Sequence, residues 1–263
     1  MPSTLILVTG SAGRVGRAVV AELLERGLPV RGFDLVPTPG LADSVVGDLA
    51  SMSDVRAAMR GVRTLVHLGA TPDDDDFMTK LLPPNIVGVF NVIESAREEG
   101  VPRVILASSG QVVWWQRMRG DTPIGIAVQP TPRGWYAATK CFLEAAGRSL
   151  AEADGRCVLA VRMGWCPRTP EQVAELAASD WARDVYFSPG DAGRFFADAV
   201  QAPAWPGYAV VYASSKPESH AVYDLEPTRA LVGYEPRDHW PMGVEEMLLA
   251  EVAKVTATLH GEN

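Results

Sequence analysis

The sequence has few cysteines and no long apolar run. Its three cysteines (Cys141, Cys157 and Cys166) are odd in number and lack the spacing of zinc ligands, so we expect buried, reduced thiols and no metal site. No apolar stretch approaches the roughly 18 residues that a membrane-spanning helix needs. The N-terminus runs directly into a predicted strand and leaves no room for a signal peptide. These absences predict a cytoplasmic protein that does not act on membranes.

Basic residues are also fewer than acidic ones. The chain has 24 lysines and arginines against 32 aspartates and glutamates, a formal net charge of −8. This balance disfavours nucleic acid or an anionic membrane surface as the main partner. With 47% apolar and 21% charged residues, the 263-residue chain has the composition of a folded protein with one large domain, or a core with a small appended lobe.

A glycine pattern lies between a strand-like and a helix-like segment. The residues Thr9-Gly10-Ser11-Ala12-Gly13-Arg14-Val15-Gly16 follow the apolar run 5–8 and precede the helical pattern 17–24. Glycine lets a pyrophosphate approach the main chain, and the N-terminus of the following helix favours an anion. A glycine-rich turn with no ligand stays an alternative, but the context favours a dinucleotide site.

An acidic residue closes the second apolar run. Asp34 follows the segment 29–33, where a carboxylate can accept hydrogen bonds from the adenosine ribose and would repel a 2′-phosphate. The cofactor is therefore predicted to be NAD rather than NADP.

Strand-like and helix-like segments alternate through the first 165 residues. We expect strands at 5–9, 29–34, 45–47, 64–68, 103–107 and 157–161, and helices at 14–26, 53–60, 85–99 and 135–152. Ser53 is a plausible N-cap, and Pro83 and Pro84 should make the third helix begin or kink near Asn85. The alternation predicts the α/β class, a doubly wound parallel sheet of the Rossmann type.

The alternation loosens after residue 165. Proline-rich loops separate a helix near 191–201, a strand at 209–212 and a last helix at 243–259. We therefore predict a Rossmann core at 1–165 that binds NAD, and a small substrate-binding lobe at 166–263. Some elements of this lobe should return to the core, at the carboxyl edge of the sheet where such folds place their ligands.

Three polar side chains could carry out proton and hydride chemistry. Tyr136 and Lys140 lie one turn apart on a predicted helix, close enough for the ammonium to lower the pKa of the phenol. Ser109 ends the strand-like segment that begins at residue 103, where its hydroxyl could hold a substrate oxygen. Such a tyrosine could take the proton when an alcohol is oxidised.

Together these motifs resemble the extended short-chain dehydrogenase/reductase superfamily, which includes the NAD-dependent epimerases and dehydratases, and within it the uronate dehydrogenases. The resemblance covers residues 4 to about 165. The matching segments are 9–16, Asp34, Asp48-Leu49, His67-Leu68-Gly69-Ala70, Asn85, Ser108-Ser109 and Tyr136-x-x-x-Lys140, with further likeness at 140–144, 162–166 and 187–191.

The resemblance implies a role for each matching residue. Tyr136 would be the general base, Lys140 would bind the nicotinamide ribose, and Ser109 would orient the reacting hydroxyl, whereas Ser108 would be structural. The implied cofactor-binding residues are Gly10, Ala12, Gly13, Arg14, Val15, Gly16, Asp34, Asp48, Leu49, Leu68, Gly69, Ala70, Asn85, Tyr136, Lys140 and Met163.

The implied substrate-binding residues include several departures from the uronate dehydrogenase pattern. They are Thr71, Ser109, Gly110, Gln111, Trp114, Trp165 and Arg183. Gly110 and Gln111 stand where those enzymes have Asn and His, and Trp165 replaces a serine, which puts a uronate substrate in doubt. Arg133 and Arg168 compete with Arg183 as carboxylate-binding residues.

Two further features are expected to be structural. His67 should have a packing role at the end of a buried strand, and the acidic run 73–76 should be a solvated loop at a helix start.

The predicted function is that of an NAD-dependent oxidoreductase. It would move hydride from a hydroxyl carbon of a sugar, sugar acid or related small alcohol to the nicotinamide. A nucleotide-sugar epimerase, or less readily a dehydratase, with retained NAD is the alternative, and a non-catalytic dinucleotide sensor is a third reading. The resemblance also suggests a homodimer or higher homo-oligomer formed by the helices near 85–99 and 135–152.

Overall fold

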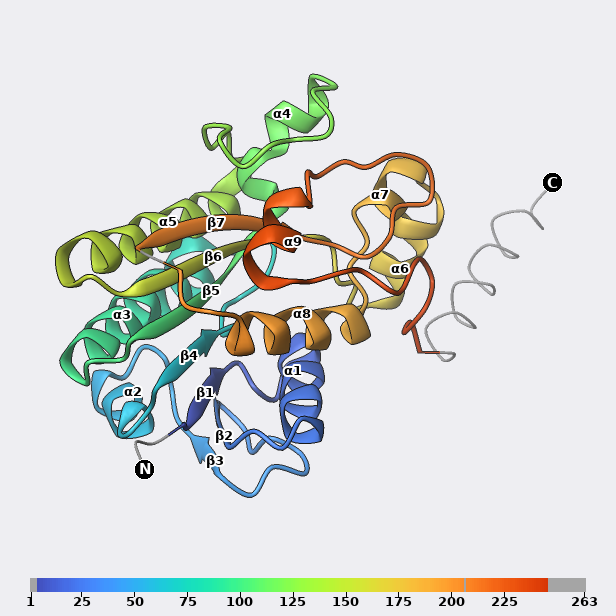
Figure 1. The fold of residues 1–263 in the computed structure, drawn as a ribbon. Helices are drawn as coiled ribbons and strands as arrows, with labels where there is room; N and C mark the ends of the chain where they lie inside the picture. Colours follow the sequence, from blue (N-terminus) through green and yellow to red (C-terminus); the bar gives the residue numbers. More distant parts are fainter. Residues whose placement is uncertain (1–3, 206, 246–263) are drawn as a thin grey trace.

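The computed structural model describes residues 4–205 and 207–245, which form a seven-stranded parallel sheet with helices on both faces (Figure 1). The strand order is β3-β2-β1-β4-β5-β6-β7. The strands are β1 (Ile6–Thr9), β2 (Val30–Asp34), β3 (Ser44–Val46), β4 (Thr64–His67), β5 (Arg103–Ser109), β6 (Cys157–Met163) and β7 (Tyr208–Ala213). The order reverses between β1 and β4, and doubly wound sheets bind ligands at such a reversal.

The helices divide between the two faces of the sheet. Their bounds are α1 (Arg14–Glu25), α2 (Met52–Met59), α3 (Gly88–Glu98), α4 (Trp114–Met118), α5 (Gly134–Asp154), α6 (Pro170–Ala177), α7 (Asp180–Asp184), α8 (Pro189–Gln201) and α9 (Glu226–Val232). Helices α1 and α8 contribute to one core cluster and α2, α3 and α5 to the other. This arrangement confirms the predicted fold class.

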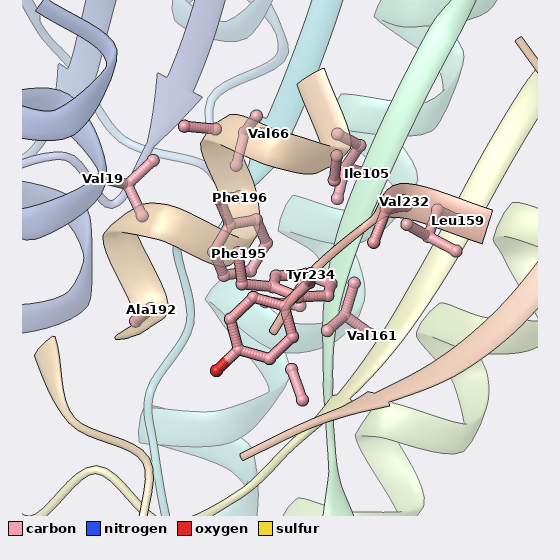
Figure 2. Packing of buried hydrophobic residues seen from close by; sticks show 14 of the residues in the cluster. Val19, Val66, Ile105, Leu159, Val161, Ala192, Phe195, Phe196, Val232 and Tyr234 are labelled. Atoms are coloured by element: carbon pink, nitrogen blue, oxygen red, sulfur yellow. The ribbon is translucent and has the colours of Figure 1, made fainter. Parts of the chain in front are cut away.

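Successive strand residues supply the two cores in turn. In β1, Ile6 and Val8 pack on the face covered by α1 and α8, whereas Leu7 packs on the opposite face. Figure 2 shows the first of these cores, in which Phe195 and Phe196 lie against the sheet beside Tyr234. Strands buried on both faces explain the near-continuous apolar runs of the sequence.

One local prediction needs correction, and a second holds only in part. The N-cap of α2 is Ser51 rather than Ser53, because the Ser51 hydroxyl accepts the Asp54 backbone N–H. The helical region before α3 begins at Phe77, well before Asn85, and passes through two π-helical turns, Phe77–Leu81 and Pro83–Val87. Proline lacks an N–H and clashes with the carbonyl four residues earlier, which disfavours α-helical turns at Pro83 and Pro84.

The C-terminal third contributes to the sheet as well as to its edge. Strand β7 pairs with β6, and α8 packs against α1. The short helices α6, α7 and α9 were not predicted. The division at residue 165 stays a prediction, and the predicted last helix at 243–259 lies almost entirely outside the described residues; residues 243–245 themselves are not helical.

The cysteines are half-buried rather than buried, and they form no disulfide in the described part of the chain. None of the helices within 4–205 and 207–245 is long and apolar enough to cross a membrane.

Candidate active site

A cavity of about 760 Å³ opens along the carboxyl edge of the sheet. It is lined by the loop after β1 and by the ends of β2, β4, β5 and β6, together with residues of α5, α6 and α7. The predicted site residues that line it are Gly10, Ala12, Gly13, Arg14, Val15, Gly16, Asp34, Asp48, Leu49, Leu68, Gly69, Ala70, Thr71, Ser109, Gly110, Gln111, Trp114, Tyr136, Lys140, Met163 and Trp165. Two others, Asn85 and Arg183, do not.

The glycine loop forms a cradle at one end of this cavity. Gly10 has a φ of +70°, and a Cβ on it would lie 2.7 Å from the Gly69 backbone, so that only glycine fits. Helix α1 begins just after Gly13, without a side-chain cap and without an acidic residue in its first turn. Its N-terminal N–H groups are therefore free of a side-chain acceptor, as a pyrophosphate-binding helix requires.

Asp34 is fixed beside the glycine loop at the end of β2. Its Oδ2 accepts a hydrogen bond of 2.9 Å from the Ala12 N–H, and its Oδ1 accepts one of 2.7 Å from the Leu35 N–H. The carboxylate is thus held at the cavity wall, next to the glycine cradle. A negative charge there fits a ribose with free hydroxyls and disfavours one that carries a 2′-phosphate.

Ser109, Tyr136 and Lys140 meet where β5 ends against α5. The Lys140 Nζ donates a 2.8 Å hydrogen bond to the Ala107 carbonyl and lies 5.6 Å from the centre of the Tyr136 ring. Ser109 lies near enough to the Tyr136 phenol to lower its pKa, and its hydroxyl accepts a 3.2 Å hydrogen bond from the Gln111 N–H. The structure therefore brings together the three side chains to which the sequence assigns the chemistry.

Burial dominates the protonation of this group. It raises the pKa of Tyr136 to about 12, with a further contribution from the Asp73 carboxylate and an opposing one from Ser109. Burial also lowers the pKa of Lys140 to about 8. The expectation that Lys140 lowers the Tyr136 pKa does not hold for the protein alone: desolvation is the largest cause of the shift, and the Lys140 ammonium is bonded to a main-chain carbonyl.

Ser108 belongs to a buried polar network behind the site. Its hydroxyl donates a 2.6 Å hydrogen bond to Glu144, which also forms a two-pronged ion pair of 2.9 Å with Arg162. The network ties β5 and β6 to α5, the helix that carries Tyr136. This placement agrees with the structural role expected for Ser108.

Asn85 supports the cavity wall instead of lining it. Its side-chain amide exchanges two hydrogen bonds with the Thr71 backbone, at 2.8 and 2.9 Å, and donates to the Thr139 hydroxyl at 3.2 Å. The direct cofactor contact expected of Asn85 is therefore not what the structure shows. Its amide is used to join the loop after β4 to α5.

The acidic run is only partly a solvated loop. The Asp74 carboxylate accepts the Tyr136 backbone N–H at 2.7 Å and so binds the first turn of α5. Asp73 forms an ion pair with Arg168 and accepts a 2.8 Å hydrogen bond from Gln172 across the cavity mouth. Asp76 caps the helical turn that begins at Phe77. These acids hold the walls of the site together.

Arg183 faces away from the cavity. It forms ion pairs with Glu218 and Asp180 and donates to the Ala177 carbonyl. A substrate contact for Arg183 therefore does not fit the structure, whereas its two rivals, Arg133 and Arg168, both line the cavity. The sequence order did not show that α7 turns Arg183 outward.

His67 has the packing role expected for it. It is 1% exposed, and its Nδ1 lies 2.7 Å from the Thr9 hydroxyl. Burial, together with the positive charge of Lys140, lowers its pKa to about 3, so its ring is neutral near pH 7. Across the described residues, no group of three or more His, Cys, Asp or Glu side chains could hold a metal ion.

Residues 6–165 match the model of the NAD dependent epimerase/dehydratase family. The chain belongs to this family. It is 31% identical to the L-arabinose 1-dehydrogenase (NAD(P)(+)) of Haloferax volcanii, over 91% of this chain and 99% of that protein. It is 30% identical to the uronate dehydrogenase of Agrobacterium fabrum, over 89% and 84% of the two chains.

Solved structures agree with these relatives. The crystal structure of uronate dehydrogenase from Agrobacterium tumefaciens superposes with a TM-score of 0.74 and 27% identity, covering 97% of this chain and 90% of that one. A tyrosine-to-alanine mutant of that enzyme, in complex with NAD, gives the same TM-score. This family member is accordingly an NAD-dependent oxidoreductase with a Rossmann fold.

The sequence did not point to several residues that line the cavity, among them Arg117, Gln172, Glu175, Trp181 and Tyr223. Arg117 follows Trp114 at helical spacing, which is a signal that could have been used. Trp181 and Tyr223 reach the cavity from segments distant in the sequence, and no local pattern marks them.

Proposed function

We propose that this oxidoreductase oxidises a hydroxyl carbon of a sugar or sugar acid, with Ser109, Tyr136 and Lys140 as its reacting group. The observation that carries the proposal is the meeting of these three side chains in the same cavity as the glycine cradle. The names of the L-arabinose 1-dehydrogenase and uronate dehydrogenase relatives support the substrate class.

Each of the three residues has a distinct part in this proposal. Ser109 holds the substrate hydroxyl through a hydrogen bond, and Tyr136 accepts its proton as the carbon gives up hydride. Lys140, anchored on the Ala107 carbonyl, binds the ribose next to the nicotinamide and places its positive charge beside the phenol. A cation close to the phenol stabilises the phenolate that has to form.

The residues present fit NAD along the rest of the cavity. The loop from Gly10 to Gly16 would hold the pyrophosphate, Asp34 the adenosine ribose, Asp48 and Leu49 the adenine, and Leu68 to Ala70 the second ribose. Bound NAD supplies the hydride acceptor, its nicotinamide ring. Met163, at the end of β6, lines the same end of the cavity as the reacting group.

A panel assay tests the proposal. The full-length protein is mixed with NAD and with neutral aldoses, uronic acids and sugar phosphates, and absorbance is followed at 340 nm. We expect NADH formation with at least one class. No absorbance change with any sugar, by protein shown to bind NAD, would contradict the proposed activity.

We also infer that the protein works as a cytoplasmic homodimer. Its free cysteines are typical of a reducing compartment. Helices α3 and α5 lie side by side (Figure 1) and expose large apolar side chains: Val87 just before α3, Phe90 on α3, and Trp135 and Phe142 on α5. A second copy that covers this face would bury these side chains.

Light scattering coupled to gel filtration tests the dimer. Phe90, which is 54% exposed, is replaced by Asp, with Met118→Asp as a control at an exposed apolar residue on α4. We expect Phe90→Asp to be monomeric and the control to match the wild type. A monomeric wild type, or two dimeric variants, would contradict this interface.

A further inference from the structure

Arg117 is held between two indole rings at the substrate end of the cavity. Its guanidinium carbon lies 3.9 Å from the ring centre of Trp114 and 3.6 Å from that of Trp181. The two indoles are nearly perpendicular, at 87°, with their centres 6.0 Å apart. Indole faces attract cations and hold a guanidinium in one orientation. The side chain is therefore fixed before any ligand arrives.

This cation has no anionic partner among the residues that the structure describes. Its Nη2 is buried and has no hydrogen-bond partner within 4–205 and 207–245, whereas Arg168 is paired with Asp73 and Arg183 with Glu218. Burial and the neighbouring Arg133 lower the pKa of Arg117. A half-buried cation without an anion is costly, so the site gains from an anion supplied by a ligand.

Arg117 lies close to the reacting group. Tyr223 is within electrostatic range of Arg117, and its hydroxyl packs directly on Gly110, where a Cβ would overlap it. Gly110 follows Ser109, and all four residues line the same cavity. A small molecule bound at Ser109 can therefore present one of its groups to the Arg117 guanidinium.

A second arginine faces the same ring. The Arg133 guanidinium lies 4.7 Å from the centre of the Trp114 ring and also lines the cavity. Two guanidinium groups therefore face one indole, and neither has a carboxylate partner among the residues described, although Asp73, Asp74 and Glu175 also line the cavity. Guanidinium groups bind the oxygens of carboxylates and phosphates in pairs.

We propose that Arg117, together with Arg133, binds an anionic group of the substrate, either a carboxylate or a phosphate monoester. This assignment deepens the proposed function and rests on it: the oxidised sugar is an acidic one, and α4 selects it. Arg183, for which the sequence suggested this task, has no part in it.

Three ligands with the same ring isolate the anionic group. D-glucose, D-glucuronate and D-glucose 6-phosphate are compared in NADH formation by the wild type, Arg117→Met and Arg119→Met, the last being an exposed arginine just after the same short helix. We expect Arg117→Met to raise the KM for the preferred acid roughly 10- to 100-fold, with the KM for NAD unchanged. Arg119→Met should behave as the wild type.

A binding measurement separates this inference from the proposed activity. Tyr136→Phe protein with NAD is titrated with the same ligands while tryptophan fluorescence is followed, since Trp114 and Trp181 flank Arg117. We expect a saturable fluorescence change with one of the acids and a weaker change with glucose. The change should be lost in the double variant that combines Tyr136→Phe with Arg117→Met. The acid that binds identifies the anion as carboxylate or phosphate.

The possible results separate the two claims. The acid could bind in a way that needs Arg117 while the wild type reduces no NAD with any sugar. That result would support the anion site and refute the proposed sugar oxidation. Glucose binding as tightly as both acids, unchanged acid binding in Arg117→Met, or no binding of any of the three ligands would overturn the anion site.

Discussion

The two ends of the cavity are built in different ways. The nucleotide end is made of main chain and short local segments: the turn after β1, the end of β2 and the loop after β4. The substrate end is made of large side chains, Trp114, Arg117, Trp165, Trp181 and Tyr223, which come from segments far apart in the sequence. Main-chain recognition suits a cofactor shared by a whole family, and side-chain recognition lets each member choose its substrate.

The largest effect should come from the residue between the two ends. Tyr136→Phe removes the proton acceptor, so turnover should fall by roughly 10²- to 10⁴-fold. The affinity for NAD should stay within a few-fold of the wild type, because the cradle is untouched. Steady-state rates at 340 nm and calorimetric titration with NAD measure the two effects. A parallel loss of NAD binding would show that the two ends are not separable.

The cradle should be broken by a single methyl group. Gly10→Ala places a Cβ 2.7 Å from the Gly69 backbone, so we expect NAD binding to be lost. Gly27→Ala is the matched control, because Gly27 has a similar φ of +71° but no atom within 4 Å of its Cβ. It should cost about 1–2 kcal/mol of stability for the left-handed backbone alone and leave NAD binding intact. Equal NAD affinity in the two variants would refute the cradle.

Asp34 should set the choice between NAD and NADP. Replacing it with Ser removes a carboxylate that would lie near a 2′-phosphate, so the preference for NAD over NADP should fall roughly tenfold or more. The ratio of kcat/KM values for the two cofactors measures the change. Asp43→Ser, a paired carboxylate outside the cavity, should leave the ratio unaltered; an unchanged ratio in Asp34→Ser would contradict the assignment.

A smaller effect is expected from the histidine buried behind the cavity. Its pKa is about 3 in the folded protein against 6.5 in the unfolded chain, so the unfolded chain binds an extra proton between these values. The free energy of unfolding should therefore fall as the pH falls through 6.5, by at most about 2 kcal/mol between pH 7 and 5. Urea unfolding at both pH values should show a smaller decrease for His67→Asn. The same decrease in both proteins would contradict a contribution of His67 to this pH dependence.

The fold could be predicted from the sequence because its signals are local. Each strand buried on both faces appears as an apolar run, and the turn after β1 needs glycine at Gly10, so both leave a trace in consecutive residues. The π-helical turns around Pro83 and Pro84 were harder to foresee, since the prolines forbid one structure without specifying another. The N-cap of α2 was hard to place because a second serine, Ser53, follows Ser51 by two residues.

The substrate end could be predicted only in part because its contacts are distant in the sequence. Trp114 was expected near the substrate because it follows the serine strand, and Trp165 because of the resemblance to uronate dehydrogenases; both line the cavity. Arg117 packs against Trp181, which lies on α7. Arg183 lies on the same short helix and pairs with Glu218, so it does not take the role expected of it. Pairings of this kind depend on the packing of loops that no local pattern describes.

Transfer of an isotope tests the central claim most directly. The wild type is incubated with NAD and a reactive sugar deuterated at its ring carbons, and the mass of the nicotinamide product is measured. A hydride moved from the hydroxyl carbon within this cavity predicts NADH that carries one deuterium. NADH without the label, or a sugar converted to its epimer with no net NADH, would contradict the account.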